Sequence, residues 1–535
     1  MNPSKIHRLS WLLLLLAVGA CARCGKPEAS GDSALTHVPA EAEVVAWVPE
    51  LGVLSERLMS LKQLELLDFV APLLRARDGE TLLNGLLVQA GVDARSREGL
   101  TQAGLDPDGD LAIALLGRRA TLLVLPVGDA KVFEATMARV ADQLFGASEV
   151  ARGEEGGLSL VRFTRTGGTE PLLTYARVGR HAVLANGADP AQLVAWAGVK
   201  GSSTMQASTA FTASRERLSG KPVAWVFARG GGRWVPQGTV EGATVALDLD
   251  LEALTARLDV PWPDARTGLG ALVPGKTPDP KLGLLPASAF AVVQSSGDLS
   301  KLGELWPWLT GQRVARAAES VGLDVQKEIL GNLKPGAVMS LSLSEGARMD
   351  AVPSLSPRLN PFSWTRMVAI ADVSDAAMAR QTLAKLPPLA PRLAFRMTPA
   401  DWDGVPVWLS SWTGGEGVHL ALVKNRLVAA APESALRDAV AAVSKDRTGG
   451  PPVDKRFAPL FEGHAIAGVV DLHRLAASVR ELPPQAWGIG GFALKPTTVR
   501  WLDALAELRA VTFTVDAKGQ AVQAQVSLVL QVEAR

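Results

Sequence analysis

Cysteine is nearly absent from this chain of 535 residues, and its two cysteines, Cys21 and Cys24, both lie close to the N-terminus. Their position excludes structural disulfides and cysteine-based metal sites from the rest of the chain. The histidines downstream are scattered, with no H-E-x-x-H or H-x-x-x-H pair that would bind zinc. They are His37, His181, His419, His464 and His473. We therefore expect no metal and no other cofactor.

An excess of charge is also lacking. The chain has 55 basic and 54 acidic residues, a formal net charge of +1, so the composition does not predict binding to nucleic acid. Beyond residue 20, no uncharged apolar run approaches the roughly 18 to 20 residues that cross a bilayer. At roughly 150 residues per domain, the length predicts two to four domains.

The N-terminus does carry a recognisable pattern, that of a signal peptide over residues 1–20. Lys5, His7 and Arg8 form a positive segment. Residues 11–20 form an apolar segment that is too short to span a membrane. The pattern predicts export from the cytoplasm.

Val18-Gly19-Ala20-Cys21 resembles the lipobox of bacterial lipoproteins. In that family the cysteine is acylated, becomes the new N-terminus and holds the protein on a membrane. The resemblance implies that Cys21 is the lipid-attachment residue and that the protein lies in the bacterial cell envelope. In enterobacteria an aspartate after the cysteine favours the inner membrane. Ala22 stands at that position here, so the outer membrane is the expected location.

Two alternatives to lipidation stay open. Ala20-Cys21-Ala22 is also an A-x-A cleavage motif, and cleavage after Ala22 would release a soluble protein. Cys21 and Cys24 could instead form a disulfide. If Cys21 is lipidated, residues 21–36, which are mostly small and polar, form a flexible tether with a reach of roughly 20 Å.

Blocks of sequence recur in the same order along the chain. PAEAEVVAWV (39–48) returns as PASAFAVVQS (286–295), KPVAWVFA (221–228) as HAIAGVVD (464–471), and the hairpin around Asp248 as that around Asp516. Six such blocks predict two homologous halves, residues 37–260 and 284–535, joined by a proline- and glycine-rich linker at 261–283.

Each half is expected to be an α+β domain, a mainly antiparallel sheet covered by amphipathic helices, because strands alternate with helices and short turns join neighbouring strands. Leu51, Leu54, Leu58 and Leu61 form the apolar stripe of one such helix. The repeat resembles secreted bacterial proteins of unknown function that open with a Pro-Ala-x-[Ala/Thr] segment. That resemblance supports the fold and implies no activity.

Residues Gly270 to Thr277, GALVPGKT, match the nucleotide-binding pattern G-x-x-x-x-G-K-[ST]. A P-loop needs a strand before it and a helix after it, so that the first N–H groups of the helix hold phosphate. Pro278 and Pro280 would break such a helix within its first turns. We therefore expect no nucleotide at this segment.

The turn Asp106-Pro107-Asp108-Gly109-Asp110 resembles the first half of a calcium loop. Such a loop requires glycine at its sixth position and glutamate at its twelfth, where Leu111 and Gly117 stand. The matching turn of the second half, Lys334-Pro335-Gly336, has no carboxylate. A turn common to both halves is therefore the better interpretation.

Two further groups of residues have mainly structural interpretations. Asp129 and Asp375 each stand where a strand ends and a helix begins, which predicts that they cap the helix. The second group, of five tryptophans, could form a partner surface or stack on sugars, but two indoles on one strand face more often pack in a core. It consists of Trp402, Trp408 and Trp412, with Trp306 and Trp308.

The hydrolase motifs G-x-S-x-G and S-x-x-K do not occur. The leading hypothesis is a non-enzymatic, lipid-anchored cell-envelope protein that binds a partner or serves as a structural module. The alternatives are a carrier or sensor of an apolar ligand such as lipid, held under the amphipathic helices, and an unrecognised hydrolase. A cleft with a Ser or Asp beside His181, His464 or His473 would favour the hydrolase.

Overall fold

The computed structural model divides into two compact units, Met1–Pro261 with Val532–Arg535 (unit 1) and Trp262–Gln531 (unit 2). The signal peptide, Cys21, Cys24 and the P-loop-like segment 270–277 lie outside the residues that the structure describes. The described residues are 33–61, 67–68, 71, 76–89, 91–117, 120–147, 149–168, 171–186, 190–230, 241–250, 252–262, 278–301, 312–344, 365–412, 415–446, 452–482 and 508–530.

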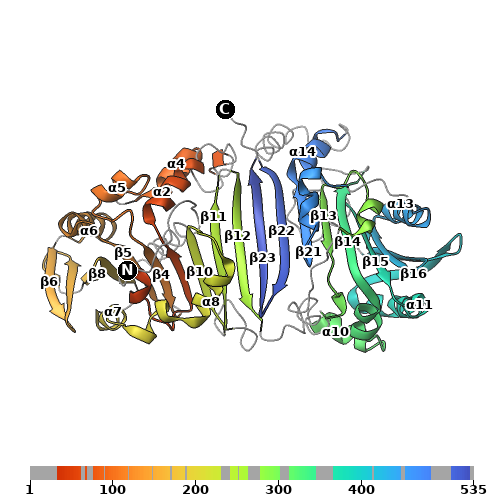
Figure 1. Ribbon diagram of the computed structural model, residues 1–535, viewed down its shortest axis with the longest axis horizontal. Helices are drawn as coiled ribbons and strands as arrows, with labels where there is room; N and C mark the ends of the chain where they lie inside the picture. Colours follow the sequence, from red (N-terminus) through yellow and green to blue (C-terminus); the bar gives the residue numbers. More distant parts are fainter. Residues whose placement is uncertain are drawn as a thin grey trace. The chain divides into compact units, whose positions relative to one another are not determined.

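Unit 1 is built on an antiparallel sheet whose described strands follow the order β12-β11-β10-β1-β4-β5-β9-β8-β7-β6 (Figure 1). The first strand in the sequence, β1, is therefore central and pairs on both sides. The strands are β1 (Val44–Val48), β4 (Leu111–Leu116), β5 (Ala120–Pro126), β6 (Glu149–Glu155), β7 (Leu158–Thr164), β8 (Pro171–Val178), β9 (His181–Asn186), β10 (Ala224–Arg229), β11 (Gly242–Leu249) and β12 (Ala253–Pro261), with a separate pair β2 (Val88–Gln89) and β3 (Val92–Asp93).

Helices cover both faces of this sheet, because successive side chains of each strand point to opposite faces. Val45 and Trp47 of β1 belong to one buried cluster, and Ala46 and Val48 belong to the other. The helices of unit 1 are η1 (Ala34–His37), α2 (Leu51–Ser60), α4 (Gly79–Leu87), α5 (Arg97–Gln102), α6 (Ala130–Phe145), α7 (Pro190–Ala197), η4 (Gly201–Ser203), η5 (Met205–Ala207) and α8 (Thr209–Leu218).

The helices α2, α5 and α6 pack on the face that carries Ala46, and η1, η5, α7 and α8 pack on the face that carries Trp47. In Figure 1 the first set lies toward the top of unit 1 and α7 and α8 lie toward the bottom. The predicted stripe of α2 is confirmed: Leu51 and Leu54 are buried, and Leu58 and Leu61 pack against the same cluster. Each such buried leucine contributes roughly 1.5–3 kcal/mol.

The capping predictions are also confirmed. The Asp129 carboxylate accepts hydrogen bonds from the N–H groups of Lys131 and Val132 at the start of α6. The Asp375 carboxylate does the same for Ala377 and Met378 at the start of α11 (Ala376–Ala384). These bonds satisfy N–H groups that have no partner within the helix.

Unit 2 is also built on an antiparallel sheet, with the described order β23-β22-β21-β13-β14-β15-β20-β19-β17-β16 and a short β18 beside β17 (Figure 1). The strands are β13 (Ala291–Ser295), β14 (Leu333–Leu343), β15 (Thr365–Val373), β16 (Phe395–Trp402), β17 (Val405–Trp412), β18 (Gly415–Glu416), β19 (His419–Val423), β20 (Arg426–Ala431), β21 (Ile466–Asp471), β22 (Leu508–Lys518) and β23 (Ala521–Leu530).

Helices cover parts of both faces here too. A large buried cluster joins η7, α13 and η14 to one face, and a smaller cluster joins α11 to Trp408 and Leu422 on the other. Besides α11, the helices of unit 2 are η7 (Pro280–Leu284), α10 (Gln312–Glu319), η9 (Val325–Ile329), η10 (Leu330–Asn332), α12 (Leu386–Leu389), η13 (Ala390–Leu393), α13 (Glu433–Ser444), η14 (Lys455–Phe461) and α14 (Leu472–Arg480).

When the two sheets are compared strand by strand, the order of strands across the sheet corresponds in the two units. β1 corresponds to β13, β4 and β5 to β14 and β15, β9 to β20, and β10 to β21. In both units a short helix, η1 or η7, precedes the first central strand. We call η1 and η7 the lead-in helices. They occupy the last residues of the predicted tether (21–36) and linker (261–283), and both contain buried side chains.

The predicted antiparallel sheet with helical cover is thus present in each unit. None of the described helices is long and apolar enough to cross a membrane.

Candidate functional site

A buried carboxylate fastens the first lead-in helix to the sheet of unit 1. Asp110, just before β4, accepts hydrogen bonds from Ser33 Oγ at 2.6 Å, from the Ala34 N–H at 2.9 Å and from Trp47 Nε1 at 2.8 Å. His181 Nε2, at the start of β9, lies 3.1 Å from Asp110 Oδ1. We call these residues the Asp110 cluster. They bring four separate parts of the chain to one point.

The Asp110 cluster is closed off from solvent. Only 13% of the Asp110 side chain and 2% of the His181 side chain are exposed. The His37 ring, at the end of η1, packs 5.2 Å from the His181 ring, centroid to centroid. Burial opposes ionisation of Asp110, but hydrogen bonds from His181, Ser33, Trp47 and Ala34 outweigh it and lower the pKa of this carboxyl below its ordinary value.

Serine, histidine and aspartate occur together here, as in a hydrolase, but their order is wrong for catalysis. A nucleophilic hydroxyl must be within hydrogen-bond reach of the base that takes its proton. The Ser33 hydroxyl instead donates to Asp110, and the aspartate lies between the serine and the histidine. The arrangement suits attachment of η1 to the sheet.

In unit 2, Ser410, His419 and Glu416 also lie together, and their arrangement is again structural. The Ser410 hydroxyl donates to the carbonyl of Val418 at 2.7 Å, and the Ser410 N–H donates to His419 Nδ1 at 2.9 Å. Nδ1 therefore accepts, which leaves the proton of a neutral ring on Nε2, 3.4 Å from Glu416 Oε2. These bonds hold neighbouring strands β17 and β19 together.

Of the other histidines singled out from the sequence, His464 meets a carboxylate. Its Nδ1 lies 2.6 Å from Asp516 Oδ2, and Asp516 also accepts the N–H of Ala465 at 2.9 Å. Asp516 itself is buried. His473 lies in α14, where its side chain is exposed.

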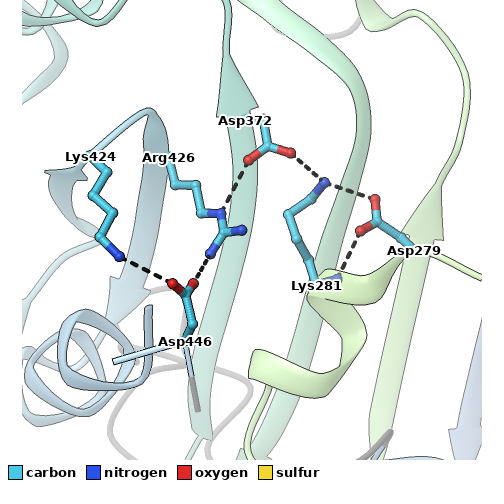
Figure 2. A network of polar contacts seen from close by, with 6 residues as sticks. All are labelled: Asp279, Lys281, Asp372, Lys424, Arg426 and Asp446. Atoms are coloured by element: carbon cyan, nitrogen blue, oxygen red, sulfur yellow. Dashed lines mark hydrogen bonds and ion pairs between the residues drawn. The ribbon is translucent and has the colours of Figure 1, made fainter. Parts of the chain in front are cut away.

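The second lead-in helix, η7, is held to the sheet of unit 2 by ion pairs between side chains (Figure 2). Lys281 in η7 reaches two carboxylates, with its Nζ 2.9 Å from Asp279 Oδ2 and 2.8 Å from Asp372 Oδ2. Arg426 Nε lies 3.3 Å from Asp372 Oδ1 and its Nη1 lies 2.8 Å from Asp446 Oδ1. We call this set, with Lys424 beyond Asp446, the Lys281 network.

The Lys281 network grades from buried to exposed. The Lys281 side chain is 6% exposed, whereas that of Lys424, 3.1 Å from Asp446 at the other end, is 59% exposed. Burial of Asp372 would raise its pKa, but Lys281 and then Arg426 outweigh that effect and lower it. The strongest interactions are therefore expected at the Lys281 end, where water screens least.

The two fastenings occupy corresponding places but use different chemistry. Arg426 begins β20 as His181 begins β9. The turn predicted at Lys334-Pro335-Gly336 is instead part of β14, where the pairing with β15 shifts register between Leu333 and Ala337. Gly336, with φ +95° and no side chain, leaves room there for the Asp279 carboxylate. A Cβ atom at position 336 would lie 2.6 Å from Asp279 Oδ2.

The calcium-like turn does not gather its carboxylates around one point. Asp106 accepts the N–H of Asp108 at 3.0 Å, the Asp108 side chain pairs with Arg97, and Asp110 faces the buried cluster described above. Across the described parts of the chain, no three His, Cys, Asp or Glu side chains come together as metal ligands.

The tryptophans are placed as follows. Trp408 is buried against α11. Trp402 is partly buried and lies under the guanidinium of Arg437, 4.0 Å from the ring centroid. Trp306, Trp308 and the side chain of Trp412 lie outside what the structure describes.

Sequence reasoning treated Asp110 as part of a turn and His181 as an isolated histidine. Their meeting depends on the pairing of β4 with β5 and of β5 with β9, which no local pattern encodes. The available signals were the position of Ser33 before an apolar stretch and the polar residue His181 at the start of an apolar strand.

Comparison with known proteins gives little further information. No family model and no curated protein matches the sequence. Three crystal forms of TP0453 are similar solved structures. Form I is 12% identical over 44% of this chain and 80% of that chain, with a TM-score of 0.25. Forms III and IV are 11% identical over 44% of this chain and 81% of theirs, with TM-scores of 0.25 and 0.24. Scores this low carry no conclusion on fold or function.

Proposed function

We propose that the protein is a lipid-anchored module of the bacterial cell envelope, attached through Cys21 to the outer membrane rather than the inner membrane. We propose that its body binds a partner or has a structural role. The Asp110 cluster is the observation that carries this proposal. A chain tethered to a membrane needs a fixed attachment where the tether meets the body. Ser33 and Ala34, the first described residues, belong to the last part of the predicted tether (21–36) and are held by a buried carboxylate.

The contacts of the serines support a non-enzymatic role for these sites. The hydroxyl groups of Ser33 and Ser410 donate to acceptors other than a histidine, and the histidines beside them hold strands or the lead-in helix. This argument counts against a hydrolase at these two sites.

We further propose that the two units arose by duplication and correspond to the repeats at 37–260 and 284–535. The matching strand order and the lead-in helix before each first strand support this proposal.

Lipidation is tested by intact mass and membrane fractionation of the full-length protein expressed in bacteria. The wild-type protein is expected to carry acyl chains and to sediment with membranes, and Cys21→Ser is expected to lose both properties. Cys24→Ser is the matched control, because it removes a thiol three residues away and keeps the lipobox. Membrane association that persists in Cys21→Ser, or a wild-type mass without acyl chains, contradicts the anchor.

Partner binding is tested by affinity purification from detergent-solubilised envelopes, with mass spectrometry of co-purifying proteins and extracted lipids. A protein that co-purifies with wild type and is absent from a mock purification supports the proposal. Recovery of the bare chain counts against a partner, and recovery of a stoichiometric lipid favours a carrier instead.

A further inference from the structure

Two tryptophans form an aromatic floor on the sheet of unit 1. Trp47 in β1 and Trp225 in β10 lie directly opposite each other, and both are buried. Arg215 of α8 lies over them, with its guanidinium carbon 4.4 Å from the Trp47 ring centroid and 5.6 Å from that of Trp225. Phe211, one turn earlier in α8, adds a third ring at 5.5 Å. The rings hold the guanidinium in place by cation–π attraction.

Among the residues that the structure describes, no carboxylate pairs with Arg215. Within the described parts of the chain its guanidinium makes no hydrogen bond or ion pair, and its Nε is buried without an acceptor. Burial lowers the pKa of Arg215, and Glu216 only partly opposes this effect. A half-buried cation without a carboxylate is costly, and proteins normally pair such groups.

Two other arginines of this chain are paired with carboxylates, as is usual for such groups. Arg437 also lies over a tryptophan, Trp402, but it pairs with Glu433 at 2.5 Å. Arg217, two residues after Arg215 in the same helix, pairs with the fully buried Asp259 at 2.7 Å. Arg215 combines a preorganised aromatic setting with an unused charge.

Within the part of unit 2 that the structure describes, the corresponding place lacks this aromatic setting. Gln294 of β13 stands at the place of Trp47 in the repeated block, and it lies opposite Ala467 of β21. Gln294 Nε2 donates to the carbonyl of Phe461, so an internal bond satisfies this position. The shared architecture therefore does not require a cation at this place.

We propose that Arg215 is a binding site for an oxyanion, a phosphate or carboxylate group that accepts hydrogen bonds from the terminal nitrogens of the guanidinium. Nε is buried without an acceptor, and the Nη1–Nη2 edge of the guanidinium offers two parallel donors, which match the two oxygens of such a group. The indoles fix the orientation of this edge before the anion arrives, which reduces the entropy lost on binding. The anion could be free in solution or belong to a lipid head group, and the site does not depend on the lipid anchor.

Calorimetric titration of the full-length protein in a Cys21→Ser background tests this site, because the acyl chains of the proposed anchor would otherwise insert into any vesicle. The probes are sodium phosphate and sodium acetate at constant ionic strength, and vesicles of phosphatidylglycerol or of phosphatidylcholine. We expect saturable binding of at least one anionic probe and none of phosphatidylcholine vesicles. Arg215→Gln should weaken binding about tenfold or more, since both charge-assisted bonds are lost. Arg437→Gln is the matched control and should bind as wild type does.

The variants also separate a binding defect from a folding defect. Arg215→Lys keeps the charge but loses the two-donor edge, and an affinity between those of wild type and Arg215→Gln is expected. Thermal unfolding of each variant should match wild type within a few degrees, because Arg215 has no hydrogen bond or ion pair to lose and its contacts with the rings are weak. Binding of soluble phosphate or acetate identifies a free anion, and binding restricted to phosphatidylglycerol vesicles identifies a head group. Equal binding by wild type and Arg215→Gln, or no binding of any anionic probe, overturns the proposal.

Discussion

At the scale of single residues, the Asp110 carboxylate is the group that joins four separate parts of the chain in unit 1. Asp110→Asn removes the charge and one acceptor oxygen, so that the donors of Ser33, Ala34, Trp47 and His181 are left incompletely bonded. We expect a loss of roughly 2–4 kcal/mol in the free energy of unfolding of unit 1. Urea denaturation measures this loss, and hydrogen exchange of the segment 33–38 should accelerate in parallel.

Asp108 provides the control for that substitution. It lies in the same turn, but its side chain is 75% exposed and pairs with the surface residue Arg97. Asp108→Asn should change stability by less than about 1 kcal/mol, as is usual for exposed ion pairs. Similar losses in both variants would mean that the turn matters and the buried cluster does not.

The lowered pKa of Asp110 sets the direction of its pH dependence. A carboxyl whose pKa is lower in the folded than in the unfolded state stabilises the protein above the unfolded pKa, and this contribution is lost as pH falls through the folded pKa. The reference value for aspartate is 3.8. The difference in melting temperature between wild type and Asp110→Asn should therefore stay constant from neutral pH down to about pH 5 and shrink at lower pH. A difference that disappears between pH 7 and 5 would contradict the assignment to this carboxyl.

At the scale of elements, the ion pairs that hold the lead-in helix η7 should contribute more to stability where they are buried than where they are exposed. Lys281→Met leaves Asp279 and Asp372 without their shared cation in a largely buried place, and we expect a loss of about 3 kcal/mol in the stability of unit 2. Lys424→Met, at the exposed end of the same network, should cost under about 1 kcal/mol. Urea denaturation followed by circular dichroism tests both variants. Equal losses would show that the contribution of these ion pairs to stability does not depend on their burial.

The elements also show what could be predicted from the sequence and what could not. The caps Asp129 and Asp375 and the stripe of α2 are local features, set within a few residues, and local spacing predicted them. The Asp110 cluster joins Ser33 to Asp110 across 77 positions and His181 to Asp110 across 71. Such a meeting follows from strand order, and strand order depends on the packing of the whole unit.

At the scale of the whole molecule, each unit has hydrophobic clusters of its own. We expect residues 33–261 and 262–531, produced separately, each to fold and to unfold in a cooperative transition. Circular dichroism and calorimetry of the two fragments test this expectation. A fragment that lacks a cooperative transition would show that its core is completed by the other part of the chain.

The central position of β1 has a mechanical consequence. Tension on the chain ahead of Ser33 is first resisted at Asp110, and beyond that point it acts along a strand hydrogen-bonded to β10 on one side and to β4 on the other. Pulling along such a strand loads many hydrogen bonds at once in shear, whereas a strand at the border of a sheet can peel away one bond at a time. The route by which the chain joins its sheet thus makes unit 1 hard to unravel from its N-terminus.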